Sequence, residues 1–231
     1  MTRLTLFLDA DDTLWENNIY FERAIERFYA LLGPAGTDRD AARAQINRQE
    51  RRAIAEIGYG LASFRLALER AFAELAPQAW GPQAAAAVAS LAAAIAAEPV
   101  RFLPRAAEVV RYLARRHRLR LLTKGNFVEQ TRKLSLSGLA PMFEQVHVLP
   151  EKNLAAYCHC LRGLQEPPAS CWMIGNSPKS DINPALAAGM NTILVPHPHT
   201  WVLEQEPVAA ACAPGCQCLT IGSLAELRNL F

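Results

Sequence analysis

Two patterns of apolar and polar residues divide the chain. Between residues 17 and 97, apolar residues recur at the spacing of amphipathic helices, which predicts helices at 19–32, 38–57, 61–76 and 83–97. Glycine and proline separate these segments, as at residues 58–60 and 81–82. No short apolar run typical of a strand interrupts them. This region is therefore predicted to be entirely helical.

The rest of the chain alternates between short apolar runs and helical segments. Residues 4–9 form an apolar run that ends in an aspartate, which is typical of a buried strand. Further strands are predicted at 119–123, 145–149, 171–175, 192–195 and 218–221, and helices at 105–117, 126–137, 153–164, 182–188 and 223–230. Such alternation indicates βαβ units and a mostly parallel sheet with right-handed crossovers.

The first predicted strand has no partner strand until residue 119. We therefore expect the α/β fold class, with a Rossmann-like parallel-sheet core and an inserted all-helical cap domain. The α/β catalytic core comprises residues 1–15 and 99–231, and the helical cap comprises residues 16–98. A chain of 231 residues is long enough for one such core and a smaller inserted domain.

Composition narrows the possible partners and the compartment. The 24 basic and 22 acidic residues give a net charge of +2, which is too balanced to predict binding to nucleic acid or to a membrane surface. The apolar run at residues 4–8 is too short for a signal peptide, and no apolar run has the length of a membrane span. Six cysteines without a secretory signal fit a reducing compartment. A cytoplasmic protein that acts on a small molecule is expected.

Polar residues follow the predicted strands. In parallel α/β sheets, ligands bind beyond the carboxyl ends of the strands, and these ends meet at one edge. The residues at or just beyond the predicted strand ends are Asp9, Asp11, Thr123, Lys124, Lys152, Asn176 and Asp181. The sequence therefore predicts that these side chains converge on one site.

Asp9 and Asp11 are the first candidates for chemistry. Two carboxylates at the end of a strand repel each other unless a cation or a proton lies between them. Mg²⁺ prefers oxygen ligands, a partly desolvated carboxylate can attack phosphorus, and a second acid can protonate the leaving oxygen. The alternative for this pair alone is an acidic surface turn.

The context favours the chemical interpretation. Residues 7–15 read FLDADDTLW, and this segment closely resembles the first motif of the haloacid dehalogenase superfamily. Three further segments resemble the other motifs of that superfamily in the expected order, at Thr123, Lys152 and residues 175–185. The resemblance spans the predicted core, and the helical region lies where the family inserts a helical cap.

The resemblance implies a role for each matching residue. Asp9 is expected to be the nucleophile, and Asp11 the general acid and base. Thr123 is expected to hydrogen-bond the transferring phosphoryl group; its alternative is an ordinary β-branched strand end. Lys152 is expected to neutralise the phosphate and the nucleophile. Lys124 and Lys133 are rival candidates for that last role.

The fourth motif departs from the family pattern. The family commonly has an acid directly after the strand glycine, whereas this chain has Asn176; Asp181 keeps the place of the second acid. The resemblance implies a Mg²⁺ site formed by Asp9, Asp11, Asn176 and Asp181. Asn176 offers a carbonyl oxygen but no charge, so the direct ligand at this end of the site is either Asn176 or Asp181. Asp181 also has an alternative as the N-cap of the following helix.

These residues together predict a magnesium-dependent phosphohydrolase. The resemblance implies a phosphomonoesterase that acts on a small phosphorylated metabolite through an aspartyl phosphate. Asp11 favours phosphorus chemistry, because the dehalogenases of the superfamily usually lack the second aspartate and need no magnesium. Three alternatives stay open: a binding or regulatory protein in which Asn176 has removed catalysis, a phosphomutase, and a dehalogenase.

Two further groups of residues were weighed and favoured less. Substrate-specificity candidates in the helical region are Asn47, Arg51, Tyr59 and Phe64, for which solvation or packing is the stronger explanation. The cysteines at 212, 216 and 218 lack the paired spacing of common zinc sites, so buried or free thiols are expected there.

Overall fold

The computed structural model describes residues 3–33, 38–209 and 215–231. Its internal contacts divide the chain into two compact units. The first unit comprises Met1–Asn18 and Val100–Phe231, and the second comprises Ile19–Pro99. Each unit is described by itself below.

A six-stranded sheet forms the centre of the first unit, in the order β3-β2-β1-β4-β5-β6. The strands are β1 (Thr5–Leu8), β2 (Arg118–Lys124), β3 (Gln145–Leu149), β4 (Cys171–Gly175), β5 (Asn191–Leu194) and β6 (Cys218–Thr220). Every pair of neighbouring strands is parallel. The predicted α/β fold with a Rossmann-like parallel sheet is therefore confirmed.

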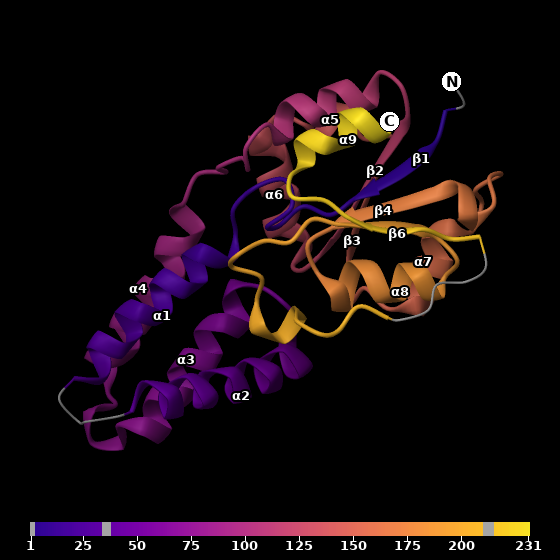
Figure 1. Cartoon of the computed structure of the whole chain (residues 1–231). Helices are drawn as coiled ribbons and strands as arrows, with labels where there is room; N and C mark the ends of the chain where they lie inside the picture. The colour runs from indigo at the N-terminus through magenta and orange to yellow at the C-terminus, as the bar shows by residue number, and fades with distance from the viewer. Residues whose placement is uncertain (1–2, 34–37, 210–214) are drawn as a thin grey trace. The chain divides into compact units, whose positions relative to one another are not determined.

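Helices cover both faces of this sheet (Figure 1). Leu6 and Leu8 of β1 belong to a core cluster that also contains residues of α5 (Ala106–Ala114), α6 (Phe127–Ser137) and α9 (Leu227–Leu230). Phe7, between them, belongs to a second cluster with residues of α7 (Leu154–Leu161) and α8 (Asn183–Ala187). Successive side chains of a strand point to opposite faces, and both faces are apolar here because both are covered.

The described residues of the second unit form helices and contain no strand. The α-helices are α1 (Asn18–Leu32), whose first residue belongs to the first unit, α2 (Arg39–Ile57), α3 (Leu61–Leu75) and α4 (Pro82–Ala97). Phe28, Ile46, Phe64 and Leu68 are in the core of this unit. In the parts of the chain that the structure describes, no helix has the length and apolar character needed to span a membrane.

The helices of the first unit differ from their predicted ranges at one or both ends, and two of the differences have a clear local cause. The helix predicted at 105–117 ends at Ala114, because the chain turns at residues 115–117 to enter β2. The helix predicted at 182–188 is preceded by a π-helical turn, Pro178–Ile182, so helical structure begins four residues earlier than predicted. Ser177 caps this turn: its hydroxyl accepts a hydrogen bond from the Ser180 amide at 2.9 Å. The N-cap interpretation of Asp181 is therefore wrong.

Candidate active site

The candidate site lies at the carboxyl edge of the parallel sheet. Strand β1 lies between β2 and β4, and Asp9 directly follows its last residue. Thr123 is the penultimate residue of β2, and Asn176 directly follows β4. The Asp9 amide extends the ladder by donating to the Ile174 carbonyl at 2.9 Å. Parallel pairing therefore carries all three residues to the same edge, as the sequence predicts.

Lys152 joins two of the predicted acids. Its ammonium contacts Asp9 Oδ1 and lies 2.7 Å from Asp181 Oδ1. The side chains of Lys152, Asp9 and Asp181 are 2%, 8% and 1% exposed. Buried charges need partners, and here one ammonium serves two carboxylates. When both acids are ionised, the cluster has one excess negative charge.

The pKa values of this cluster reflect its burial. Burial and the neighbouring Asp181 carboxylate raise the pKa of Asp9 to about 7, although the Lys152 ammonium opposes them. Burial acts to lower the pKa of Lys152, but the two carboxylates outweigh it and hold the lysine pKa above its usual value. Lys152 is therefore a permanent cation beside a carboxylate that is costly to ionise, and a further cation would favour the ionised form.

Thr13 connects Asp9 to Asn176. Its hydroxyl donates to Asp9 Oδ2 at 3.0 Å and lies 3.4 Å from Asn176 Oδ1. All three residues are buried. Carboxylate and amide oxygens are the hard donors that Mg²⁺ prefers, and the excess negative charge of the neighbouring cluster favours a cation. The residues present therefore fit the metal that the resemblance implies.

Asp181 is held tightly within its own loop. Its Oδ1 faces Lys152, and its Oδ2 accepts the Ser177 amide at 2.9 Å. A Cβ atom at Gly175 would lie 2.2 Å from Asp181 Oδ2, so the carboxylate can take this position only because residue 175 has no side chain. Both oxygens of Asp181 are thus engaged by the protein, whereas Asn176 directs its carbonyl oxygen towards Thr13 and Asp9.

Thr123 has an unsatisfied polar atom. The residue is 1% exposed, and its Oγ1 has no hydrogen-bond partner among the described residues. A buried hydroxyl without a partner costs free energy, about 1–3 kcal/mol, and such groups call for an explanation. A ligand that hydrogen-bonds this hydroxyl is the explanation that its place at the strand end suggests.

Asp11 has a different environment from Asp9. Its carboxylate accepts hydrogen bonds from Trp15 Nε1 and Gln130 Nε2, each at 2.8 Å. Lys133 Nζ lies 2.5 and 2.6 Å from its two oxygens. Gln130 and Lys133 both belong to α6. The structure therefore brings Asp9, Lys152, Asp181 and Asn176 together but turns the Asp11 side chain towards α6.

The three candidate lysines occupy three different positions. Among the described residues, the lysine that contacts Asp9 is Lys152. Lys124 lies 2.6 Å from Glu204 and 3.2 Å from Glu151, and Lys133 pairs with Asp11 as described above. Sequence reasoning missed Gln130 and Glu204, because nothing in their local sequence indicates which distant groups they contact.

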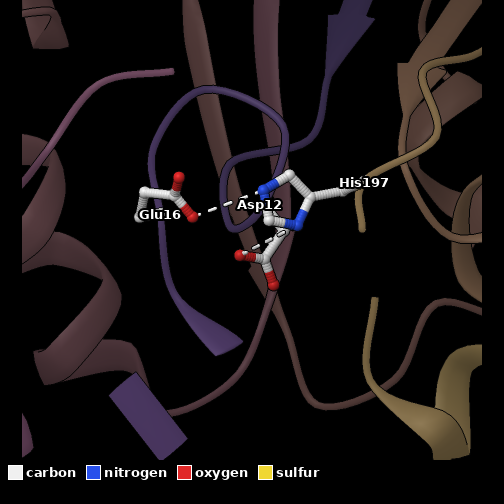
Figure 2. Close-up of side chains that lie close together, drawn as sticks. All are labelled: Asp12, Glu16 and His197. Carbon is white, nitrogen blue, oxygen red and sulfur yellow. Dashed lines mark ion pairs between the residues drawn. The ribbon is translucent and has the colours of Figure 1, made fainter. Parts of the chain in front are cut away.

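A second group of titratable side chains lies beside the first motif (Figure 2). The His197 ring stands between two carboxylates, with Nδ1 3.8 Å from Asp12 and Nε2 3.3 Å from Glu16. The Asp12 carboxylate also accepts the backbone amides of Asn17 and Asn18, and Asp12 has a left-handed φ of 57°. Nδ1 accepts the His199 backbone amide at 3.3 Å, so the ring donates through Nε2 to Glu16 and only lies near Asp12. This group positions the loop that follows Asp11.

Most of the residues that the sequence favoured less have ordinary environments where they are described; the exception is Asn47, whose Oδ1 is buried and has no hydrogen-bond partner among the described residues. Phe64 is buried in the core of the second unit with an edge-on contact to Phe21, and Arg51 is exposed. Cys216 donates through its thiol to the Gly189 carbonyl at 3.2 Å. Cys212 lies outside the described residues.

Comparison with known proteins identifies the family. The model of the haloacid dehalogenase-like hydrolases matches residues 4–189, and the chain belongs to this family. The resemblance stated from the four motifs is thereby confirmed, and so is the expectation that the chain is a hydrolase. A search of curated protein sequences finds no match.

Solved structures share the fold over the whole chain. A haloacid dehalogenase-like family hydrolase from Xanthomonas campestris is 26% identical, with a TM-score of 0.82 over 99% of this chain and 91% of that one. A HAD-hydrolase from Bacillus subtilis, bound to magnesium, is 20% identical, with a TM-score of 0.64 over 100% and 99% of the two chains. The L-2-haloacid dehalogenase from Xanthobacter autotrophicus is 17% identical, with a TM-score of 0.62 over 99% and 98%.

Proposed function

We propose that this hydrolase is a magnesium-dependent phosphomonoesterase that acts on a small phosphorylated metabolite in the cytoplasm. The observation that carries the proposal is the arrangement around Asp9. A buried carboxylate faces a permanent ammonium on one oxygen and the Thr13–Asn176 pair on the other. The unpartnered hydroxyl of Thr123 belongs to the penultimate residue of the adjacent strand β2. This arrangement supplies a nucleophile, a positive charge and a hydrogen-bond donor for an anionic phosphoryl group.

The proposed hydrolysis has two steps, formation and hydrolysis of an aspartyl phosphate. An oxygen of Asp9 attacks phosphorus, the bond between phosphorus and the ester oxygen breaks, and protonated Asp11 gives its proton to the departing alcohol. Asp11 then removes a proton from water, which attacks the same phosphorus. The bond between phosphorus and Asp9 breaks, and inorganic phosphate leaves. To transfer these protons, the Asp11 carboxyl group must leave Lys133 and contact the substrate.

The chain's own residues stabilise the charge in both steps. Lys152 holds Asp9 in place and neutralises negative charge on the phosphoryl oxygens, while Asp181 holds Lys152. Thr123 donates its free hydroxyl to a phosphoryl oxygen. Asp9, the backbone carbonyl of Asp11 and the Asn176 side chain would hold Mg²⁺, which compensates the excess negative charge of the site. The magnesium in the Bacillus subtilis relative supports this choice of metal.

The helical unit is the part of the chain that we expect to control access to the site and the choice of substrate. We propose that residues 19–99 act as the cap of the site, as their place between β1 and the rest of the core suggests. A cap excludes water from the reaction and selects the substrate.

The proposal is tested by phosphate release from a panel of phosphorylated metabolites, with and without Mg²⁺. Asp9→Asn is assayed in parallel, because an amide is a poor nucleophile. We expect magnesium-dependent release that disappears in the variant. Release of halide from a 2-haloacid without added metal, and no release of phosphate, would instead make the protein a dehalogenase like the Xanthobacter relative.

A further inference from the structure

The side-chain amide of Asn176 lies between two hydroxyl groups. Asn176 Oδ1 is 3.4 Å from Thr13 Oγ1, and Asn176 Nδ2 is 3.3 Å from Thr200 Oγ1. An asparagine amide has two distinct ends, a donor and an acceptor, and the surrounding hydrogen bonds decide which end faces which side. Only one of the two orientations presents an oxygen to the Asp9 side of the site.

The hydrogen bonds of Thr200 favour one of the two orientations. Thr200 Oγ1 donates its single proton to the His197 carbonyl at 2.9 Å. A carbonyl cannot donate in return, so Thr200 Oγ1 can only accept from any further partner. The atom of Asn176 that faces Thr200 must therefore be the amide nitrogen. The carbonyl oxygen consequently lies on the side of Thr13. Thr13 donates its single proton to Asp9 Oδ2 at 3.0 Å and could accept an amide N–H equally well, so Thr200 is the contact that keeps the carbonyl oxygen on this side.

The segment that contains Thr200 is anchored on both sides of this contact. Upstream, the His199 carbonyl accepts the Asn18 side-chain amide at 2.8 Å, and His197 lies between Asp12 and Glu16. Downstream, buried Glu204 is 2.6 Å from Lys124 Nζ and accepts the Ser177 hydroxyl at 2.8 Å. The Thr200 hydroxyl is thus held in place by groups that also hold the loops of Asp9 and Asn176.

We propose that Thr200 is a positioning residue that orients the Asn176 amide, so that its carbonyl oxygen serves as the magnesium ligand at a place where the family has an acid. The inference rests on the proposed magnesium-dependent function. A carboxylate in this position needs no such partner, because its two oxygens are equivalent. A neutral amide does need one, because after a half-turn it would present N–H groups to the cation.

A double-mutant cycle tests the inference through magnesium binding alone. The affinity for Mg²⁺ is measured by isothermal titration calorimetry, without substrate, for the parent, Thr200→Val, Asn176→Asp and the double variant. Loss of a group that orients a metal ligand typically weakens affinity by 10- to 100-fold. We expect Thr200→Val to weaken binding by about tenfold in the parent and by less than about twofold in the Asn176→Asp background.

Three controls separate orientation from general damage. Thr200→Ser keeps the hydroxyl and is expected to bind Mg²⁺ like the parent. Thr220→Val, at the exposed last residue of β6, makes the same chemical change away from the site and is expected to have no effect. Thermal melting verifies that each variant is folded, and no variant is expected to lose its cooperative transition.

The outcomes distinguish the inference from the function on which it rests. Equal magnesium affinity of the parent and Thr200→Val would overturn the positioning role and leave the proposed function intact. An equal loss in the parent and in the Asn176→Asp background would do the same, because a carboxylate has no amide to orient. A folded parent that binds no Mg²⁺ would overturn both.

Discussion

At the scale of single residues, the site depends on small groups that hold charged ones. Gly175 leaves space for the Asp181 carboxylate, the Asp181 carboxylate holds Lys152, and Lys152 contacts Asp9. Thr13 and Thr200 bracket the Asn176 amide. The contacts of Lys152 with Asp9 and Asp181 are buried, and the Asn176–Thr200 contact is partly buried, so single-atom changes are expected to have measurable effects.

Asn176→Asp is expected to raise the affinity for Mg²⁺. The substitution replaces a neutral oxygen donor by a charged one of nearly the same shape, and attraction to a divalent cation increases. We expect at least a tenfold gain, about 1.4 kcal/mol, in a calorimetric titration. Unchanged magnesium affinity would mean that residue 176 does not face the metal and that Asp181 is the ligand.

Gly175→Ala is expected to destabilise the protein and abolish turnover. The added methyl group would lie 2.2 Å from Asp181 Oδ2, so the carboxylate and its lysine must move. Overpacking of this kind costs about 1–3 kcal/mol, which urea unfolding measures. Gly81→Ala is the matched control, because a Cβ there meets nothing within 4 Å. If the two variants were equally stable and active, the proposed close packing would be wrong.

At the scale of elements, the segment between β5 and β6 supports the catalytic loops through Glu204. The Glu204 carboxylate binds Lys124 of β2 and also contacts the hydroxyls of Ser177 and Ser180. Burial acts to raise its pKa, but the Lys124 ammonium and the hydrogen bonds from Lys124, Ser180 and Ser177 outweigh burial, and the net pKa is lowered. Glu204 is therefore ionised at neutral pH and ties three segments together.

Glu204→Gln is expected to destabilise the fold in a pH-dependent way. Removing one charge from a buried ion pair costs on the order of 3 kcal/mol. The pKa of Glu204 is lower in the folded protein than the usual 4.5, so its stabilisation is present above pH 4.5 and is lost as the pH falls through the folded pKa. Parent and variant should therefore differ in urea unfolding at pH 7 and converge at acidic pH.

The matched control for this variant is Glu108→Gln. Glu108 makes exposed ion pairs with Arg105 and Arg228, which solvent screens. We expect little change in its unfolding at pH 7. A difference between parent and Glu204→Gln that stayed constant from neutral to acidic pH would show that the charge of Glu204 is not the source of the stabilisation.

At the scale of the whole molecule, the sequence predicts the fold well because the fold follows local patterns. Apolar runs alternating with helices predict a parallel sheet, and such a sheet brings Asp9, Thr123 and Asn176 to one edge. Contacts between residues that are far apart in the sequence cannot be predicted from local patterns of residues. Asp9 and Lys152 are separated by 143 positions, and Asp11 and Lys133 by 122. The family resemblance suggested the first contact, and nothing in the sequence suggested the second.

The boundaries of elements were harder to predict than their existence. The π-helical turn at Pro178–Ile182 places Asp181 inside the turn and makes Ser177 the cap, whereas the sequence pattern fits an ordinary helix with Asp181 at its start. The roles of Asp9, Asp11, Thr123, Lys152, Asn176 and Asp181 stay predictions. The structure describes the surroundings of these residues, and the experiments proposed here test their roles.

The most direct test of the account is to identify the residue that becomes phosphorylated during turnover. The protein is mixed with its best phosphorylated substrate and Mg²⁺, quenched in acid within one turnover, and analysed by peptide mass spectrometry. The account predicts an acid-stable, hydroxylamine-sensitive phosphoryl group on the peptide containing Asp9, and none in Asp9→Asn. Magnesium-dependent turnover with the phosphoryl group on another residue, or with full activity in Asp9→Asn, would contradict it.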